Sequence, residues 1–385
     1  MKLAYVTTFN ARDLNVSDNW AGTGYYIPEA LKKQSLPIQY IGSLKERLDL
    51  QVICKFKRHY HKLLSQGNYL KTLDPLILQN YANQVSQDLS KMEADIVFSA
   101  TVTPIAYLDC KQPIIFWADA TFENLLNFYP QFTGLCEESI QHGHQMERMA
   151  IQRCKLAIYS SEWAARSAIE YYQADPSKVK VVPFGANIET NRTEEGIRDL
   201  IESRSATKCK LLFLGVDWLR KGGDVALEVA KQLNRLGLQT ELTVVGSQPS
   251  LDEPLPDFVK LKGFISKFTE EGRAQIDRFI SDSHFLILPS ISDCTPIVFC
   301  EANSLGVPCL SRNIGGIPTI IKDDLNGKLF DRDSKPIQYS EYIFDLFTDY
   351  TRYKSLALSA FHQYESRLNW SVSGQKIQEL LRSLV

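Results

Sequence analysis

The apolar run Phe285–Leu288 leads into the stretch Pro289-Ser290-Ile291-Ser292-Asp293-Cys294-Thr295-Pro296-Ile297-Val298-Phe299-Cys300-Glu301-Ala302. The run predicts a buried strand, and Ile297–Leu305 predicts a helix that starts after a short loop. Backbone amides in the loop and at the helix start favour an anion. Two acids flank this point: Asp293 lies in the loop, and Glu301 lies about one turn inside the helix. Since acids after a strand also cap helices, the stretch predicts either a cap or a binding site for an anion and hydroxyl groups.

Short apolar runs alternate with amphipathic segments on both sides of this stretch. Before residue 189 the expected strands are Leu3–Thr7, Ile38–Ile41, Ile96–Ser99, Ile114–Trp117, Leu156–Ser160 and Val179–Val182, and the expected helices are Ile27–Lys33, Leu76–Leu89, Glu137–Arg153 and Glu162–Tyr172. After it, the expected strands are Leu211–Gly215, Leu242–Val245, Val259–Leu261 and Val307–Leu310, with a helix over Asp224–Leu236. Continuous apolar strands between helices predict parallel sheets that are covered on both faces.

The polar stretch Glu189–Lys210 divides this α/β pattern into two halves and is interpreted as an interdomain connection. Each half is long enough for its own doubly wound domain and its own core. Two such domains in series predict a cleft where the carboxyl ends of both sheets face each other. Ligands of this architecture bind at that edge.

Composition narrows the function classes. The chain has 385 residues, 44% of them hydrophobic, and 43 basic against 45 acidic residues, so a disordered protein or a nucleic-acid binder is not expected. No apolar run approaches the roughly 20 residues that span a bilayer, and the N-terminus does not resemble a signal peptide. The eight cysteines form no C-x-x-C pair, and His142 and His144 do not share a helix face, so we expect reduced thiols, no metal site and a cytoplasmic location.

Two further loops between a strand and a helix carry glycines. The first contains Gly22-Thr23-Gly24, before the expected helix at Pro28–Lys33, and suits either an anion or a plain tight turn. The second runs from Gly215 to Asp224 and contains Arg220 and Lys221, with Asp224 expected to cap the helix. A diphosphate needs such cations, although a solvated basic pair is the alternative interpretation.

In this order and spacing, the three loops resemble those of the retaining glycosyltransferases of family four (glycosyl transferases group 1), which have the GT-B fold. The resemblance covers nearly the whole chain. Other matching motifs are Ser160-Ser161-Glu162-Trp163, Val182-Pro183-Phe184-Gly185-Ala186-Asn187, Val244-Val245-Gly246, Gly263-Phe264 and Gly315-Gly316-Ile317-Pro318. It implies two Rossmann-like domains: residues 1–188 for the acceptor and residues 189–367 for a nucleotide-sugar. Residues of about 368–385 resemble the final helices that cross back onto the first domain.

The resemblance also implies roles for single residues. Lys221 matches the lysine that binds the donor diphosphate, Glu301 the acid that holds the ribose, and Asp293 the acid that touches the transferred sugar. The other implied donor-binding positions are Gly22, Thr23, Gly24, Arg220, Phe264, Ile265, Thr295, Ile297 and Val298.

Three positions depart from the family pattern. Asp293 stands where glutamate is usual, and a displacement of about 1 Å can cost roughly a hundredfold in rate. Val216 replaces the usual arginine, so Arg220 is expected to supply the second cation. The usual first-domain histidine is absent, which leaves Asp119 as the polar candidate, either catalytic or capping a helix at Phe122–Phe128.

The resemblance implies a metal-independent, retaining hexosyltransferase without a cofactor. It would move a sugar from a UDP- or GDP-sugar to a hydroxyl of a glycan, lipid or small molecule, in polysaccharide or glycolipid biosynthesis. The alternatives are a catalytically silent nucleotide-sugar-binding subunit and, since few histidines lie near the inferred site, less favourably a nucleotide-sugar epimerase.

The segment Leu48–Leu64 predicts a helix with an apolar stripe of Val52, Phe56, Tyr60 and Leu63. Its basic residues, Lys55, Arg58 and Lys62, lie on another face. Such a helix could lie on the inner, anionic surface of a membrane as a peripheral contact. We favour the simpler interpretation, in which the stripe packs against the core and the basic residues are solvated.

Overall fold

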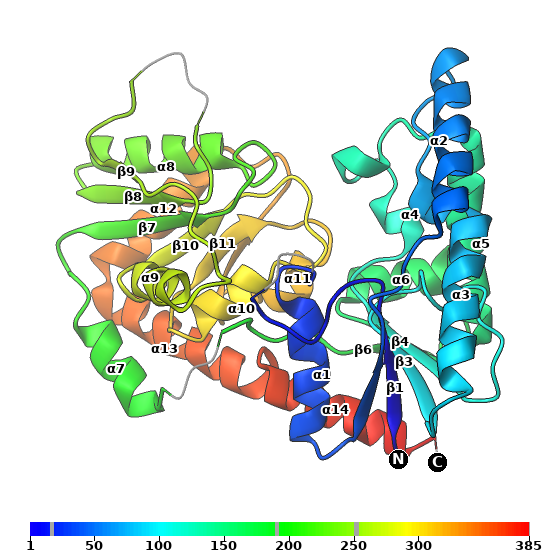
Figure 1. Cartoon of the computed structure of the whole chain (residues 1–385). Coiled ribbons are helices and arrows are strands. Elements are labelled where there is room, and N and C mark those ends of the chain that lie inside the picture. Colours follow the sequence, from blue (N-terminus) through cyan, green and yellow to red (C-terminus); the bar gives the residue numbers. More distant parts are fainter. Residues whose placement is uncertain (16–18, 189–191, 250–253, 385) are drawn as a thin grey trace. The chain divides into compact units, whose positions relative to one another are not determined.

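The computed structural model describes the chain except for residues 16–18, 189–191, 250–253 and 385 (Figure 1). Two compact units make up the fold: Met1–Pro183 with Ser373–Val385, and Phe184–Val372. Residues 189–191, where the interdomain connection is predicted to begin, lie outside the described residues.

The first unit is built on a parallel sheet with the strand order β2-β1-β3-β4-β5-β6. Its strands are β1 (Leu3–Val6), β2 (Ile38–Ile41), β3 (Ile96–Ser99), β4 (Ile114–Ala118), β5 (Cys154–Tyr159) and β6 (Val179–Val181). Its helices are α1 (Thr23–Lys33), α2 (Leu48–Leu63), α3 (Pro75–Leu89), α4 (Phe122–Leu125), α5 (Glu137–Arg153), α6 (Glu162–Glu170) and α14 (Trp370–Arg382), with the 3₁₀ turns η1 (Lys71–Leu73) and η2 (Pro130–Phe132). Helices α1 and α14 cover one face of the sheet, and α3 and α5 cover the other (Figure 1).

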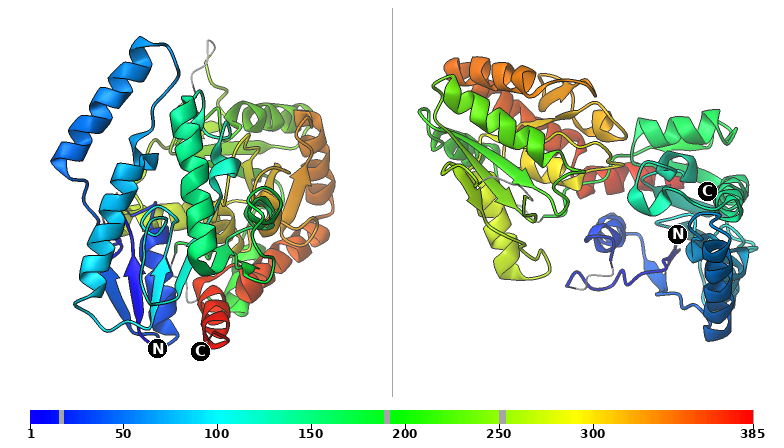
Figure 2. Two further views of the ribbon diagram at one scale, coloured as in Figure 1. Left: turned by 90° about the vertical axis from the view of Figure 1, so that its right-hand side faces the viewer. Right: turned by 90° about the horizontal axis from the view of Figure 1, so that it is seen from above.

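The second unit repeats this plan with the parallel strand order β12-β11-β10-β7-β8-β9. Its strands are β7 (Cys209–Leu214), β8 (Thr240–Val245), β9 (Val259–Leu261), β10 (Phe285–Leu288), β11 (Cys309–Arg312) and β12 (Gly327–Phe330). Its helices are α7 (Glu194–Glu202), α8 (Gly223–Arg235), α9 (Glu270–Ser281), α10 (Ile297–Asn303), α11 (Ile317–Ile320), α12 (Pro336–Thr348) and α13 (Tyr350–Arg367). The sheet lies between helical layers, with α8 packed on α12 and α10 packed on α13 (Figure 2). The predicted pair of doubly wound α/β domains is confirmed.

Helix α1 starts earlier than the sequence suggested. It begins at Thr23 after Gly22, whose φ of 94° ends the preceding loop, and Pro28 lies inside the helix. Proline has no N–H to donate to the carbonyl of Gly24, four residues before it. The hydroxyl of Tyr5 donates to that carbonyl instead, at 3.3 Å, and the tertiary contact lets the helix continue through Pro28.

The predicted connection Glu189–Lys210 is not irregular along its length, because it contains α7. Thr193 caps this helix by accepting from the amide of Gly196, and Ile197 and Ile201 are buried against α13. Leu200 between them is half-buried against the same core, so the burial rests on three apolar residues within little more than one turn. That is too short a pattern for a helix to be predicted from periodicity.

Other boundaries differ from expectation as well, and three differences bear on the loops beside the site. The strand expected at Val307–Leu310 is β11, shifted two residues onward. The helix expected at Phe122–Phe128 ends at Leu125, because Leu126 is extended and Asn127 has a φ of 57°. Asp224 does not cap α8; Gly222 is the N-cap residue, and the Asp224 carboxylate accepts from the indole N–H of Trp218 at 2.6 Å.

The chain returns to the first unit within α14. Gly374 lies against Ala30 of α1, where an added Cβ would be 2.7 Å from the Ala30 carbonyl oxygen. Ser373 donates to the carbonyl of Pro183 at 2.7 Å. The last helix therefore completes the first unit, although it is the most distant part of the sequence.

Candidate functional site

Four loops of the second unit leave strands at the same edge of the sheet. They follow β7, β9, β10 and β11, and parallel strands place these carboxyl ends together. The loop between β7 and α8 is fixed against the loop after β10. Gly222 has a φ of 78°, and an added Cβ would lie 2.2 Å from the carbonyl oxygen of Pro289, so only glycine fits. The amide of Ile291 also donates to the carbonyl of Arg220 at 2.8 Å.

Lys221 and Asp293 form an ion pair that joins these two loops. The Lys221 ammonium donates to Oδ2 of Asp293, and the two side chains are only 13% and 9% exposed. The Asp293 carbonyl accepts from the amide of Gly316 at 3.2 Å, which adds the loop after β11. The structure therefore brings together the predicted diphosphate lysine and the predicted sugar-contacting acid, which are far apart in sequence.

Arg220 lies next to this pair and supports the loop after β10. Its guanidinium donates to the Ser292 carbonyl at 2.9 Å and lies 3.3 Å from the Asp217 carboxylate. Its positive charge is thus close to the loop that carries Asp293. Val216, which replaces the usual arginine, is exposed at the start of the loop between β7 and α8.

Glu301 lies on α10 and is fully buried. Its Oε2 accepts from the ammonium of Lys267, in the loop after β9, whereas its Oε1 is buried without a hydrogen-bond partner among the described residues. Sequence reasoning missed Lys267. A cation just beyond the Gly263-Phe264-Ile265 motif, after a strand of a parallel sheet, is the signal that could have found it.

The remaining predicted donor-binding residues of this unit are close in sequence to Lys267, Asp293 and Glu301. Phe264 presents an exposed ring (69%), and Ile265 packs partly against the core. Thr295 is half-buried before α10, and Ile297 and Val298 are its first residues, where amides lack partners within the helix.

The predicted residues of the first unit form a second group. Gly22 donates its amide to Oδ1 of buried Asn19 at 2.7 Å, and Thr23 and Gly24 open α1. Trp20 and Ala21 both have left-handed backbones, with φ of 55° and 52°, so this loop has a defined, strained shape.

Asp119 follows β4 and is half-buried. It does not cap α4, because Thr121 does so by accepting from the amide of Asn124 at 3.3 Å. The capping interpretation of Asp119 is therefore wrong, and its role as a polar candidate stays a prediction.

A partly buried charge network that the sequence did not reveal lies under α2. The Lys57 ammonium donates to Asp74 at 2.7 Å and to Glu138 at 2.8 Å, and His61 pairs with Glu138 at 2.7 Å. Burial alone raises the pKa of Asp74, but hydrogen bonds from Lys57 and Tyr69 outweigh it and lower that pKa. Carboxylate oxygens of Asp74 and Glu138 and a ring nitrogen of His142, atoms of the kind that can bind a metal ion, lie within 4.8 Å of one another. The ammonium of Lys57 supplies positive charge at this position.

The outer side of α2 corrects another expectation. Its large apolar residues do not pack against the core; the exposed set, called the α2 surface below, is Leu48, Val52, Ile53, Phe56, Tyr60, Leu63 and the adjoining Leu64. Phe56 is 71% exposed and Leu63 69%. The helix lies beside α5 and is held there by the charge network, because only Cys54 and His61 of α2 are buried (Figure 1).

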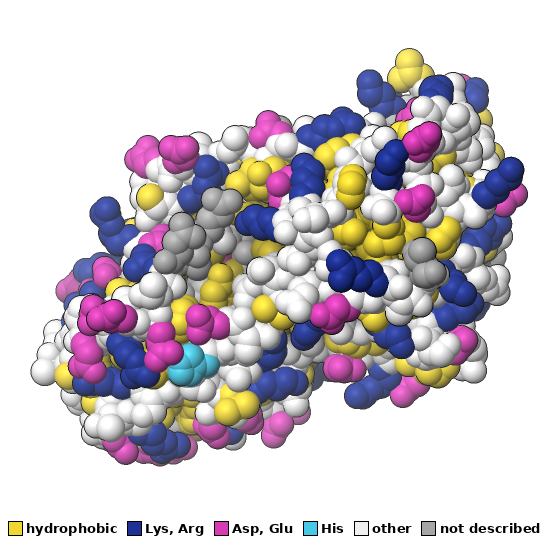
Figure 3. Space-filling model, turned by 90° about the horizontal axis from the view of Figure 1, so that it is seen from below, with side chains coloured by type: hydrophobic (Ala, Val, Ile, Leu, Met, Phe, Trp, Pro, Cys, Tyr) yellow, Lys and Arg dark blue, Asp and Glu magenta, His cyan; other side chains and the backbone are white. Residues whose placement is uncertain are grey.

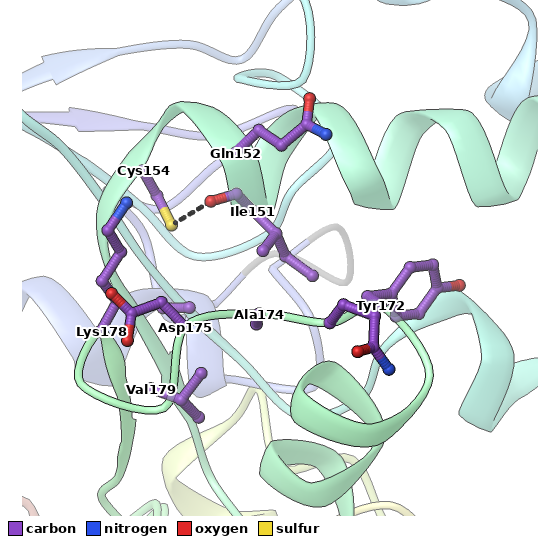
Figure 4. Close-up of a pocket in the computed structure, with 10 residues that line it drawn as sticks. Ile151, Gln152, Cys154, Tyr172, Ala174, Asp175, Lys178 and Val179 are labelled. Carbon is purple, nitrogen blue, oxygen red and sulfur yellow. Dashed lines mark hydrogen bonds between the residues drawn. The ribbon is translucent and has the colours of Figure 1, made fainter.

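A cavity of about 340 Å³ opens in the first unit beside Cys154 and Val179, the first residues of β5 and β6 (Figure 4). It therefore lies at the amino ends of these strands, opposite the edge at which ligands of such sheets bind. Basic and acidic side chains are interspersed over the face drawn in Figure 3, in keeping with the near-neutral net charge. No helix in the described part of the chain is both long and apolar enough to pass through a bilayer.

Comparison with known proteins agrees with this architecture. Residues 200–362 match the family model described as "Glycosyl transferases group 1". The D-inositol 3-phosphate glycosyltransferases of Thermobifida fusca and Streptomyces scabiei are 26% and 24% identical over 227 and 254 residues, or 55% and 61% of this chain. These matches cover 51% and 55% of the relatives, so the chain spans about half the length of the curated relatives it matches.

Solved structures resemble the whole fold. Sucrose-phosphate synthase from Thermosynechococcus elongatus superposes with a TM-score of 0.67 at 14% identity, covering 100% of this chain and 99% of that one. Anabaena Alr3699/HepE, solved in complex with UDP, gives a TM-score of 0.65 at 14% identity and covers both chains completely. The fold is GT-B, and the second unit carries a domain of the glycosyl transferases group 1 family; the resemblance noted in the sequence is confirmed.

Proposed function

We propose that the chain is a retaining glycosyltransferase that moves a hexosyl group from a UDP- or GDP-sugar to a hydroxyl of a glycan, lipid or small molecule. One observation carries the proposal. Lys221, Asp293 and Glu301, the residues that the resemblance assigns to the donor, follow strands of the sheet that lies within the matched residues 200–362. Each of the two acids is paired with a lysine. Alr3699/HepE, similar in fold, has been solved with UDP and with UDP-glucose, which supports a nucleotide-sugar as the donor.

In the proposed reaction, Lys221 stabilises the leaving diphosphate. Its ammonium is held in place by Asp293, so the charge is positioned before the glycosidic C–O bond breaks. Amides at the start of α10 and the charge of Arg220 add to this field. The departing phosphate oxygen takes the proton of the acceptor hydroxyl, which attacks on the same face of the sugar, so the anomeric configuration is retained.

The test is a donor panel followed by turnover. UDP- and GDP-sugars are screened by thermal shift, because a ligand that binds the folded state raises its melting temperature. Nucleotide release is then measured with cell-derived acceptors for the intact protein and for Lys221→Ala. We expect release that falls by roughly a hundredfold or more in the variant, as for loss of one positioned charge. Lys260→Ala, an exposed lysine on β9, is the matched control and keeps full activity.

The outcomes separate the candidate functions. Donors that bind without any turnover would support the silent binding subunit, and turnover to an epimeric nucleotide-sugar would support an epimerase. A protein that binds no nucleotide-sugar contradicts all three.

We also propose that the α2 surface rests on an anionic membrane at the cytoplasmic side, which would bring a lipid-linked acceptor to the enzyme. The apolar side chains point outward, and the helix is attached to the protein by charges instead of by its apolar stripe. Lys55, Arg58 and Lys62 are all exposed on the neighbouring face of the same helix. Apolar insertion together with positive charge is the combination that binds anionic bilayers.

Flotation with phosphatidylglycerol liposomes tests this contact. We expect the intact protein to float, and the triple change of Lys55, Arg58 and Lys62 to Gln to reduce its affinity about a hundredfold, at about 1 kcal/mol per charge. Changing Lys33, Lys111 and Lys155 to Gln removes equal charge from exposed positions of the same unit outside α2 and should leave flotation unchanged. The proposal is contradicted if the intact protein floats with neither neutral nor anionic liposomes and remains in the unbound fraction.

A further inference from the structure

The two oxygens of the Glu301 carboxylate have different surroundings. Oε2 accepts from Lys267, whereas Oε1 is buried and has no partner among the described residues. A buried acceptor without a donor is costly and rare in folded proteins, so such an atom needs an explanation. Other polar atoms at the same edge share this state, since the hydroxyls of Ser247 and Ser290, just beyond β8 and β10, are also buried and have no partner within the described part of the chain.

The backbone of Lys267 is fixed by contacts with α9, whereas its side chain is partly exposed. Its carbonyl accepts from the Arg273 guanidinium at 2.9 Å. The preceding carbonyl, of Ser266, would lie 1.9 Å from a Cβ at Gly272, so the loop packs closely on the first turn of α9. The Lys267 side chain is nevertheless 34% exposed, while the Glu301 side chain is 0% exposed. The lysine side chain is therefore partly open to solvent, while its backbone position in the loop is fixed.

We propose that Lys267 is a positioning residue for the ribose of a nucleoside diphosphate and acts through Glu301. Its ammonium donates to Oε2 and balances the negative charge of the buried carboxylate, whose oxygens accept hydrogen bonds. Oε1 then accepts from a ribose hydroxyl, which the lysine admits by moving aside while it stays close enough to balance the charge. The inference rests on the proposed function and adds one residue, Lys267, to it. The preference for ribonucleotides over nucleotides that lack the 2′ and 3′ hydroxyls, which follows from the ribose role that the resemblance implies for Glu301, serves as its readout.

A purely structural ion pair would look different. In the network under α2, both oxygens of Asp74 and both oxygens of Glu138 accept hydrogen bonds. Such satisfied pairs are complete without a ligand. The Lys267–Glu301 pair leaves one acceptor open, at the edge of the sheet where ligands bind.

The experiment compares UDP with 2′,3′-dideoxyuridine 5′-diphosphate, and GDP with its dideoxy counterpart, by titration calorimetry on the full chain. A hydrogen bond to a charged acceptor corresponds to about a tenfold to hundredfold preference, which we expect for the ribonucleotide in the intact protein. In Lys267→Met the ribonucleotide Kd should rise at least about tenfold, with the dideoxynucleotide Kd changed by less than about threefold. Lys267→Arg should retain the preference, and Lys260→Met is the charge-matched control.

Each result decides between roles. If Lys267→Met weakens both nucleotides equally, the lysine contacts phosphate or base directly and the inference is wrong. If it changes neither, the pair is structural and the inference is equally wrong. Should Lys267→Met fail to fold, Lys267→Gln, which keeps a donor and removes the charge, gives the same comparison. An intact protein that binds none of the nucleotides contradicts the proposed function itself, and the inference with it.

Discussion

The two units share an architecture but differ in how they bury carboxylates. In the first unit, Asp74 and Glu138 have every oxygen bonded, to Lys57, His61, Tyr69 and the amide of Leu76. In the second unit, the buried Glu301 has one oxygen bonded to Lys267 and one open. A network in which every polar atom has a hydrogen bond stabilises the fold, whereas an acceptor without a hydrogen bond can accept one from a ligand. Burial and pairing alone therefore do not identify a functional site; at Glu301 an open acceptor coincides with the edge of the sheet at which ligands bind.

The largest expected effect concerns a third way to bury a carboxylate, seen in Glu147 of α5. Burial raises its pKa to about 8, and hydrogen bonds from the Phe122 amide and the Tyr159 hydroxyl offset this only in part. The folded state keeps a proton that the unfolded chain releases above its ordinary pKa of 4.5. Stability should therefore fall as pH rises, by roughly 1.4 kcal/mol per unit between about pH 5 and 8.

Urea unfolding at several pH values measures this slope. Glu147→Gln, neutral at every pH, should flatten it, whereas Glu137→Gln at an exposed position of the same helix should leave it unchanged. A slope that survives Glu147→Gln would show that another group carries the linked proton.

The next effect sharpens the contrast between a structural and a binding carboxylate. Asp74→Ala should lower the free energy of unfolding by about 3 kcal/mol, because it breaks a buried ion pair and removes the N-cap of α3. Nucleotide affinity should not change. Asp88→Ala, on the exposed side of the same helix, should cost no more than about 0.5 kcal/mol. If Asp74→Ala weakens nucleotide binding and leaves the free energy of unfolding unchanged, the distinction between the structural Asp74 and the binding Glu301 is wrong.

The smallest effect is expected for an exposed pair. Lys354 on α13 lies 2.6 Å from Glu202 on α7, with the two side chains 35% and 62% exposed. A double-mutant cycle with Lys354→Met and Glu202→Gln should give a coupling below about 1 kcal/mol, and less at high salt. A larger value would mean that surface pairs also fix α7 to its unit.

Much of this fold could be predicted from the order of apolar runs. Strands such as Ile96–Ser99 and Phe285–Leu288 have the predicted bounds, because buried parallel strands need continuous apolar sequence. Helix α7 and the early start of α1 could not be predicted. The first depends on a few apolar residues that a helix distant in sequence covers, and the second on a tyrosine hydroxyl from β1.

The site divides in the same manner. Lys221, Asp293 and Glu301 were predicted because their loops follow strands and match family motifs. Lys267 and the network under α2 were not, because their partners are 34 and 17 to 81 positions away in sequence. The outward face of α2 was predicted wrongly, since an amphipathic pattern states that one face is apolar but not what that face contacts.

By itself, the sequence determined the alternation of strands and helices, the division into two α/β halves, and the types of residue at each strand end. These are local properties of spacing and composition. Only the tertiary structure decided which lysine neutralises which acid, which carboxylate oxygen remains open, and which apolar residues stay exposed. The physical reason is that charge pairing and burial depend on distances between segments, and the topology of the sheet sets those distances.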